Sequence, residues 1–310
     1  GTAIQGVAHA ELSFQGALPY AHERRSMRAL SGKKEPEQVA DALIWHPDVR
    51  RMLLTQKAIA EGGRAMVYGA AKIADQMFNA VTEGDQAKYK KYDDELGFYT
   101  PILKGFLTEM GLEAANLGIQ VFGGHGYIGE HGMEQIARDA RISTLYEGTT
   151  GIQALDLLGR KVLLNTKGKC VRDFSATMLR LIKPYSLQRT PMGQMMRTLA
   201  RRTAQWNVLT TLIMLRASKD REQVGSSSVD YLMYSGFVMM AYFWALQASK
   251  AAELFASGKG KESNDFYTAK IQTAEFYFAR LLPRADGHYS AALAPTSAVM
   301  QMPQELFQMA

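Results

Sequence analysis

The sequence predicts an all-α fold: a helical bundle with a further helical region appended toward the C-terminus. Three observations support this. Apolar residues recur at three- and four-residue spacings through most of the 310 residues, no useful stretch alternates with the period of a β-strand, and only 9 residues are proline. Hydrophobic residues make up 47% of the chain, which is enough apolar surface for a dense core and excludes a disordered polymer.

The order of the predicted helices follows from apolar spacing and turn residues. They cover residues 1–24, 47–81, 86–122, 133–146, 149–164, 171–183, 192–218, 228–256 and 264–282. In the first, Pro19 predicts a kink or a restart. The second begins at His46-Pro47-Asp48, because proline fits a first helical turn and an aspartate is stabilised at the positive helix end. Inside that helix, Gly62-Gly63 and Gly69 predict close packing against a neighbour.

Turns and boundaries are expected where glycine, lysine and polar residues cluster. Gly84-Asp85 and the run Gly123-Gly124-His125-Gly126 each end a helix. Asn165–Lys169 is the best linker candidate, so we predict two units, residues 1–165 and 166–310. The chain begins without an initiator methionine and with a helical pattern already running, and lacks a signal-peptide pattern, so we expect a piece of a longer protein.

Tyr231–Ser249 contains 19 residues without a charge, which is about the length of a membrane span. Its bulky side chains follow the three- and four-residue spacing of a packed helix, and Ser235, Gln247 and Ser249 add polar groups. We therefore predict a buried core helix and no membrane span.

Composition limits the chemistry only weakly. The formal net charge of +6 suits a polyanionic small molecule as well as a nucleic acid. Cys170 is the single cysteine, which excludes an intramolecular disulfide and a multi-cysteine zinc site and favours a reducing, cytoplasmic location. The six histidines show no paired metal-ligand spacing, so no metal is expected.

The chemistry-bearing residues concentrate between positions 120 and 153. Three segments stand out: QVFGGHGY at 120–127, RDAR at 138–141 and YEGTTGIQ at 146–153. Gly123, Gly124 and Gly126 permit tight turns and the close approach of a ligand to the backbone. Glu147 lies between an aromatic residue and a Gly-Thr-Thr turn, where a partly buried carboxylate can serve as a general base, although a solvent-exposed helix-terminal glutamate fits the same pattern.

These three segments, in this order and spacing, resemble the C-terminal half of the acyl-CoA dehydrogenases, flavoenzymes that desaturate acyl-CoA thioesters. The resemblance covers about residues 1–164. The remainder, with SVDYLMYSGFVMMAYFWA and FYTAKIQTAEFYFARLLPR, resembles the larger bacterial branch of the family. Members of that branch act on methylmercaptopropionyl-CoA or on a broad range of fatty acyl-CoA substrates.

The resemblance implies a catalytic role for Glu147, which matches the family's base in its Tyr-Glu-Gly motif. The base removes the α-proton of the thioester while a hydride leaves the β-carbon for the flavin. Tyr146 and Gly148, on either side of Glu147, are the expected substrate-binding residues.

The same resemblance implies FAD as the cofactor. Arg24 matches the arginine that pairs with the FAD pyrophosphate, and Ser26 keeps the hydroxyl of that motif, although Met27 and Arg28 depart from the family pattern. Thr149 matches a residue that contacts FAD. Gln120, Gly123 and Gly124 match the region that approaches FAD, typically that of a neighbouring subunit.

Further expectations concern partners. The family implies an acyl-CoA substrate, an electron-transfer flavoprotein as acceptor and a homodimer or homotetramer, with no nucleic acid partner. Its N-terminal helical domain and middle β-domain are not encoded in these 310 residues, so we expect this chain alone to be inactive. Two alternatives stay open: a non-catalytic helical assembly module of the same fold, and a DNA-repair-associated flavoprotein relative.

Overall fold

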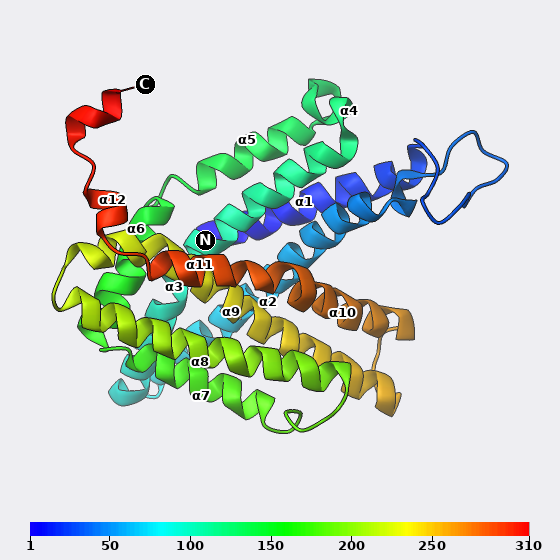
Figure 1. Ribbon diagram of the computed structural model, residues 1–310. Helices are drawn as coiled ribbons and strands as arrows, with labels where there is room; N and C mark the ends of the chain where they lie inside the picture. The colour runs from blue at the N-terminus through cyan, green and yellow to red at the C-terminus, as the bar shows by residue number, and fades with distance from the viewer. Residues whose placement is uncertain (310) are drawn as a thin grey trace.

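Most residues lie in long helices in the computed structural model, which describes residues 1–309 (Figure 1). The first three are α1 (Thr2–Glu23), α2 (Pro47–Thr82) and α3 (Gln86–Phe122). They are followed by α4 (Gly124–Tyr127), α5 (Met133–Ser143), α6 (Thr150–Leu155), α7 (Lys169–Ile182), α8 (Pro191–Ala217), α9 (Glu222–Ser257), α10 (Asn264–Phe276), α11 (Ala285–Ala292) and α12 (Ser297–Met300).

Shorter segments complete the architecture. Asp156–Asn165 continues α6 and Tyr277–Leu281 continues α10 as π-helix, and four 3₁₀ turns lie at Leu43–Trp45, Gly129–His131, Leu282–Arg284 and Gln304–Gln308. The described residues hold no strand; only an isolated antiparallel bridge joins Arg25 to Ala42. The all-α prediction is therefore confirmed.

The observed helices differ most clearly from the predicted ones in three places. The helix expected over 133–146 ends at Ser143, because the residues that follow form the tight turn described below. α9 begins at Glu222 rather than 228: Gln223 and Ser227 are buried, and the Ser227 hydroxyl donates to the carbonyl of Ala292 at 2.6 Å. α11 is not predicted by the sequence pattern.

α9 is the central helix of the fold and packs against α2, α3, α6, α8, α10 and α11. Glycines on α2 and α3 make room for its large side chains. A Cβ at Gly62 would lie 2.5 Å from the Trp244 indole nitrogen, and one at Gly105 would lie 2.8 Å from Leu232. Trp244 in turn donates its indole N–H to the carbonyl of Ala58 at 3.1 Å. The prediction of close helix packing at the α2 glycines is thus confirmed.

The uncharged stretch Tyr231–Ser249 lies inside this core. Nearly all of its side chains are buried by protein, as in a core helix. Within residues 1–309, no helix has both the length and the apolar character needed to cross a membrane.

One hydrophobic core extends across the predicted boundary between residues 165 and 166. Phe98 of α3, Phe174 of α7 and Trp206 of α8 meet in it, with ring centroids 6.0–6.4 Å apart. A second, smaller cluster joins the C-terminal ends of α1 and α3 to the N-terminal part of α2, around Ala21, Leu53 and Val121. The second cluster supports the end of the bundle from which the α1–α2 connection projects (Figure 1).

Candidate active site

The turn around Glu147 links α5 to α6 and contains two consecutive residues in the left-handed backbone region. Glu147 has φ 53° and Gly148 has φ 88°. Glycine adopts this conformation freely, but for a glutamate it costs about 1 kcal/mol or more. The Thr149 hydroxyl then caps α6 by accepting the backbone N–H of Ile152 at 3.4 Å. A conformation this unfavourable persists only where surrounding contacts hold it.

Those contacts come from three other elements. From α3, the Lys104 ammonium donates to the Gly148 carbonyl at 2.7 Å, and Glu109 accepts from the Thr150 hydroxyl at 2.5 Å. From α6, the Gln153 amide donates to the Glu147 carbonyl at 2.9 Å. Side chains from α3 and α6 therefore hold two consecutive carbonyls of the turn, those of Gly148 and Glu147.

α1 supplies the remaining contacts, at its N-terminal end. The Thr2 hydroxyl donates to the Glu147 carboxylate, and the Tyr146 hydroxyl donates to the Gln5 side chain. The Glu147 side chain is otherwise exposed. Its sequence pattern fits both a partly buried carboxylate and a solvent-exposed one, and the described residues provide the exposed environment.

Lys104 is a site residue that the sequence analysis missed. It is only 5% exposed, in the middle of α3 between Leu103 and Gly105. Burial lowers the pKa of its ammonium group, while the negative charges of Glu109 and Glu147 act in the opposite direction. The signal available in the sequence was a lone lysine inside the apolar run PILKGFL.

A second group of predicted site residues lies at the other end of α1. Arg24 follows the last turn of α1 and its side chain is exposed, with no hydrogen bond or ion pair to any residue of the described chain. The Ser26 backbone N–H donates to the Asp41 carbonyl at 3.1 Å. Met27 is in the left-handed region (φ 60°) and is 77% exposed.

The glycine run at the end of α3 belongs to this second group. Gln120 lies on the last turn of α3, and Gly123 has φ 60°. A Cβ at Gly123 or Gly124 would meet no atom within 4 Å, so the backbone there is open to a ligand or a partner. The run is fixed to α1 by Tyr20, whose ring stacks on Phe122 with centroids 3.9 Å apart.

Asp41 organises the α1–α2 connection and was also missed by the sequence analysis. Its side chain is fully buried and accepts backbone N–H groups from Ala29 at 2.8 Å, Glu35 at 2.9 Å and Lys34 at 3.0 Å. Arg28 adds a side-chain contact at 3.2 Å. These donors, that of Ala29 foremost, hold the pKa of the carboxyl well below its usual range. Its sequence signal was a single carboxylate between Ala40 and Ala42.

The two groups lie at opposite ends of α1 (Figure 1). Thr2 contacts Glu147 at the start of the helix, and Arg24 follows its end. At 1.5 Å per residue the 22 residues of α1 span about 33 Å. The structure thus brings Tyr146, Glu147, Gly148 and Thr149 together, and Arg24 and Ser26 together with the glycine end of α3, as two separate sites.

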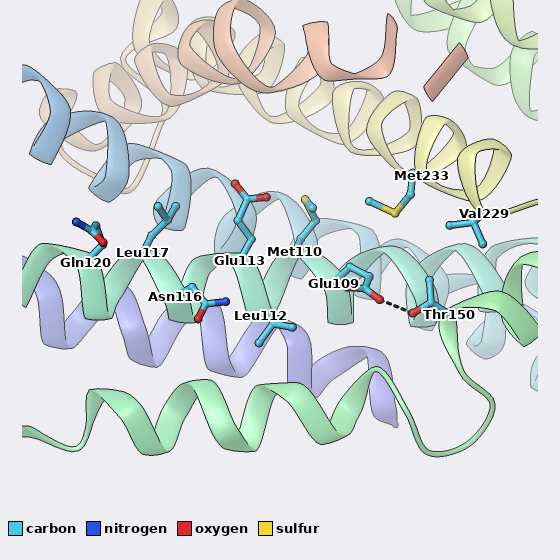
Figure 2. Close-up of a pocket in the computed structure, with 10 residues that line it drawn as sticks. All are labelled: Glu109, Met110, Leu112, Glu113, Asn116, Leu117, Gln120, Thr150, Val229 and Met233. Carbon is cyan, nitrogen blue, oxygen red and sulfur yellow. Dashed lines mark hydrogen bonds between the residues drawn. The ribbon is translucent and has the colours of Figure 1, made fainter. Parts of the chain in front are cut away.

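An open groove of about 740 Å³ follows α3 between the two sites, with Thr150 at one end and Gln120 at the other (Figure 2). It is lined by Glu109, Met110, Leu112, Glu113, Asn116, Leu117, Gln120, Thr150, Val229 and Met233. Two carboxylates line this groove, Glu109 and Glu113, and Arg284 pairs with Glu113 at 2.7 Å. Residues 1–309 contain no cluster of three or more His, Cys, Asp or Glu side chains able to hold a metal.

Comparison with known proteins decides the family. The family model described as acyl-CoA dehydrogenase, C-terminal domain, matches residues 1–163. The chain belongs to the acyl-CoA dehydrogenase family. A second family model, described as acetyl-CoA dehydrogenase C-terminal like, matches residues 171–303. The resemblance inferred from the three motif segments is confirmed.

Relatives and solved structures agree with this assignment. The chain is 36% identical over 287 residues to 3-methylmercaptopropionyl-CoA dehydrogenase of Ruegeria pomeroyi, covering 93% of this chain and 47% of the relative. It is 30% identical over 285 residues to the broad-specificity linear acyl-CoA dehydrogenase FadE5 of Mycobacterium tuberculosis, covering 90% and 46%. An acyl-CoA dehydrogenase from Bacillus anthracis, solved with FAD, shares the fold with a TM-score of 0.69 at 16% identity, covering 94% of this chain and 47% of that one. The chain spans about half the length of these proteins.

Proposed function

We propose that this chain is the C-terminal part of an FAD-dependent acyl-CoA dehydrogenase that desaturates an acyl-CoA thioester between its α- and β-carbons. The observation that carries the proposal is Glu147, an exposed carboxylate on a strained turn that α1, α3 and α6 hold in place. Strain that is held by several contacts is typical of a functional site. The proposal makes the whole protein an oxidoreductase acting on a CH–CH bond.

In this reaction the chain's own part is to remove a proton. The Glu147 carboxylate takes the α-proton of the thioester, and the backbone N–H of Glu147 is the expected donor to the thioester oxygen, where charge develops. Tyr146 and Gly148 flank the reacting carbons. Bound FAD supplies the acceptor for the β-hydride, so the substrate loses one proton and one hydride and becomes an enoyl-CoA.

The residues proposed to hold FAD fit that group chemically. Arg24 offers an exposed guanidinium, which matches a pyrophosphate with two parallel hydrogen bonds. Gly123 and Gly124 offer open backbone, and Ser26, Gln120 and Thr149 add polar side chains. No Cβ blocks approach at the two glycines.

The separation of the two sites supports a homodimer or homotetramer. Arg24 and Thr2, the residue that contacts Glu147, lie at opposite ends of α1, whose 22 residues span about 33 Å. We infer that one FAD does not reach both ends within a single chain. A second copy that presents its Arg24 end near Glu147 of the first would complete each site. We propose acyl-CoA as substrate, an electron-transfer flavoprotein as acceptor and a cytoplasmic location on the same family grounds.

A flavin-bleaching assay on the full-length protein tests the function. Anaerobic addition of acyl-CoA thioesters of several chain lengths, methylmercaptopropionyl-CoA included, is expected to bleach the flavin absorption with at least one of them. No bleaching with any thioester would favour the non-catalytic assembly module. DNA binding that weakens with salt would favour the DNA-repair-associated relative.

The 310-residue chain by itself provides a second test. We expect a folded and oligomeric protein, because its helices close on one core. We expect it to be colourless, because the chain spans about half the length of its relatives and a flavin held from one side only binds weakly. Size-exclusion chromatography with light scattering and a visible spectrum measure both properties. A yellow chain with one flavin per copy would show that the cofactor site needs nothing beyond these residues.

A further inference from the structure

Lys104 is a lysine in a place where lysine is rarely found. It lies among the buried residues of α3, and its neighbours Leu103, Gly105 and Phe106 all face protein. A buried ammonium group is stable only with hydrogen-bond partners or an opposite charge nearby. The group that the Lys104 ammonium contacts should therefore explain why a lysine occupies this position.

That partner is a carbonyl and not a carboxylate. The Lys104 ammonium donates to the Gly148 oxygen at 2.7 Å, and within residues 1–309 it has no carboxylate oxygen within 4.0 Å. Two carboxylates lie near enough to influence its charge, Glu109 and Glu147. Glu109 already accepts the Thr150 hydroxyl. A lysine present only to balance charge would pair with one of them.

The carbonyl that Lys104 binds is a sensitive point of the turn. It belongs to Gly148, the second of two consecutive left-handed residues, and the first of them is Glu147. Rotation of this peptide group would change ψ of Gly148 and allow the turn to relax toward the ordinary backbone regions. The Glu147 Cα–Cβ direction would then move, and with it the carboxylate.

We propose that Lys104 is a positioning residue for Glu147, holding the strained turn by its hydrogen bond to the Gly148 carbonyl. Gln153 assists from the other side by binding the Glu147 carbonyl at 2.9 Å. The role in turnover rests on the proposed function of Glu147 as the base. The hold on the turn is independent of that function and can be measured by itself.

Hydrogen exchange on the 310-residue chain tests the hold. The hydrogen-bonded backbone N–H groups of the turn and of the α6 start are those of Leu145, Tyr146, Ile152 and Gln153. In Lys104→Met these four should exchange at least about tenfold faster, while the α9 core keeps its protection. Lys104→Arg keeps the charge and the donors and should leave exchange in the turn near the wild-type rate. Lys91→Met is the matched control, because Lys91 is an exposed lysine of the same helix. Unchanged exchange in the Lys104→Met turn overturns the proposal, as does an equal rise throughout the core.

Kinetics of the full-length enzyme test the consequence. Misplacing a catalytic group by about 1 Å can cost roughly 100-fold in rate, so Lys104→Met should lower kcat about 100-fold while KM and flavin content change less than about threefold. Lys104→Arg should restore most of kcat. Should Lys104→Met fail to fold, the arginine variant decides. A folded Lys104→Arg enzyme whose turn exchanges faster while kcat stays within about threefold of wild type overturns the proposal.

The two failures are distinguishable. A wild-type enzyme whose flavin is not bleached by any thioester contradicts the proposed function. The hydrogen-exchange test of the turn does not depend on that result. An active wild type with unchanged kcat in Lys104→Met defeats the positioning role alone.

Discussion

The Glu147 turn and the α1–α2 connection both hold an unfavourable backbone conformation, but they do so with buried charges of opposite sign. Each contains a residue other than glycine in the left-handed region, Glu147 (φ 53°) and Met27 (φ 60°), and each presents a charged side chain to solvent. Each also depends on one buried charge. The turn is held by the cation of Lys104, which donates to its carbonyl, and the connection by the anion of Asp41, which accepts from its N–H groups.

The difference lies in where the buried charge comes from. Lys104 belongs to another helix, distant in sequence from the turn, whereas Asp41 belongs to the connection that it organises. The conformation of the turn therefore depends on the packing of α3, and that of the connection depends mainly on its own residues. This difference fits the proposed roles, because a base that faces a substrate atom benefits from rigid outside support, whereas a loop that contacts a cofactor can be folded locally.

The largest expected effect is at the turn itself. Glu147→Gln keeps the shape of the side chain and removes the proposed base, so kcat of the full-length enzyme should fall by about 10²–10⁴-fold with flavin still bound. Steady-state kinetics and the visible spectrum measure both. Glu262→Gln, an exposed glutamate between α9 and α10, is the control. A Glu147→Gln enzyme with kcat within tenfold of wild type would show that the base lies elsewhere, and the turn would then have no catalytic role to compare with the connection.

At the connection the expected effect is on cofactor binding. Arg24→Ala removes the proposed pyrophosphate partner, so the flavin Kd should rise about 10- to 100-fold, as for loss of a charge-assisted hydrogen bond. The flavin-saturated enzyme should keep kcat within about threefold. Arg50→Ala, an exposed arginine on the first turn of α2, is the control. Equal flavin affinity in the Arg24 variant would contradict the assignment of this region to the cofactor.

The lowered pKa of the buried Asp41 carboxyl predicts how the folding of the connection depends on pH. Its folded-state pKa lies below its unfolded value of about 3.9, so its contribution is complete above that value and is lost as the pH falls toward the folded value. Backbone exchange in residues 24–46 should therefore be constant from about pH 7 to 5 and show lost protection below about pH 4, after correction for intrinsic rates.

Asp41→Asn sharpens the same test. The amide places N–H donors against either Ala29 or the Lys34–Glu35 pair, so the connection should exchange faster already at pH 7, by about tenfold, with little further change on acidification. Glu37→Gln, an exposed carboxylate of the same connection, should behave as wild type. A connection that stays fully protected in Asp41→Asn would show that this loop, too, is held from outside.

The smallest effect concerns Thr2. Its hydroxyl donates to the Glu147 carboxylate, but the backbone of the turn is held by Lys104 and Gln153. Thr2→Val should thus lower kcat only about two- to fivefold, close to the loss of one solvent-accessible hydrogen bond. A drop as large as that expected for Lys104→Met would move the main support of the base from α3 to α1.

The sequence by itself determined the helices and the family. Apolar spacing, proline at a first turn and glycine at helix ends act within a few residues, so they predicted α2 and α3 closely and identified Tyr231–Ser249 as core. The motif segments identified the acyl-CoA dehydrogenase family because their residue types and spacing are specific. Assignment of the site residues, Glu147 and Arg24 among them, stays a prediction for the experiments above.

Only the tertiary structure decided what holds those residues and how far apart they lie. Lys104 reaches Gly148 across 44 positions of sequence, and nothing in the run PILKGFL says where its ammonium points. Asp41 reads as an ordinary loop carboxylate until the chain folds around it, and the start of α9 at Glu222 depends on burial against α11. Local patterns encode local geometry, whereas a buried charge is defined by partners that packing alone brings within hydrogen-bond distance.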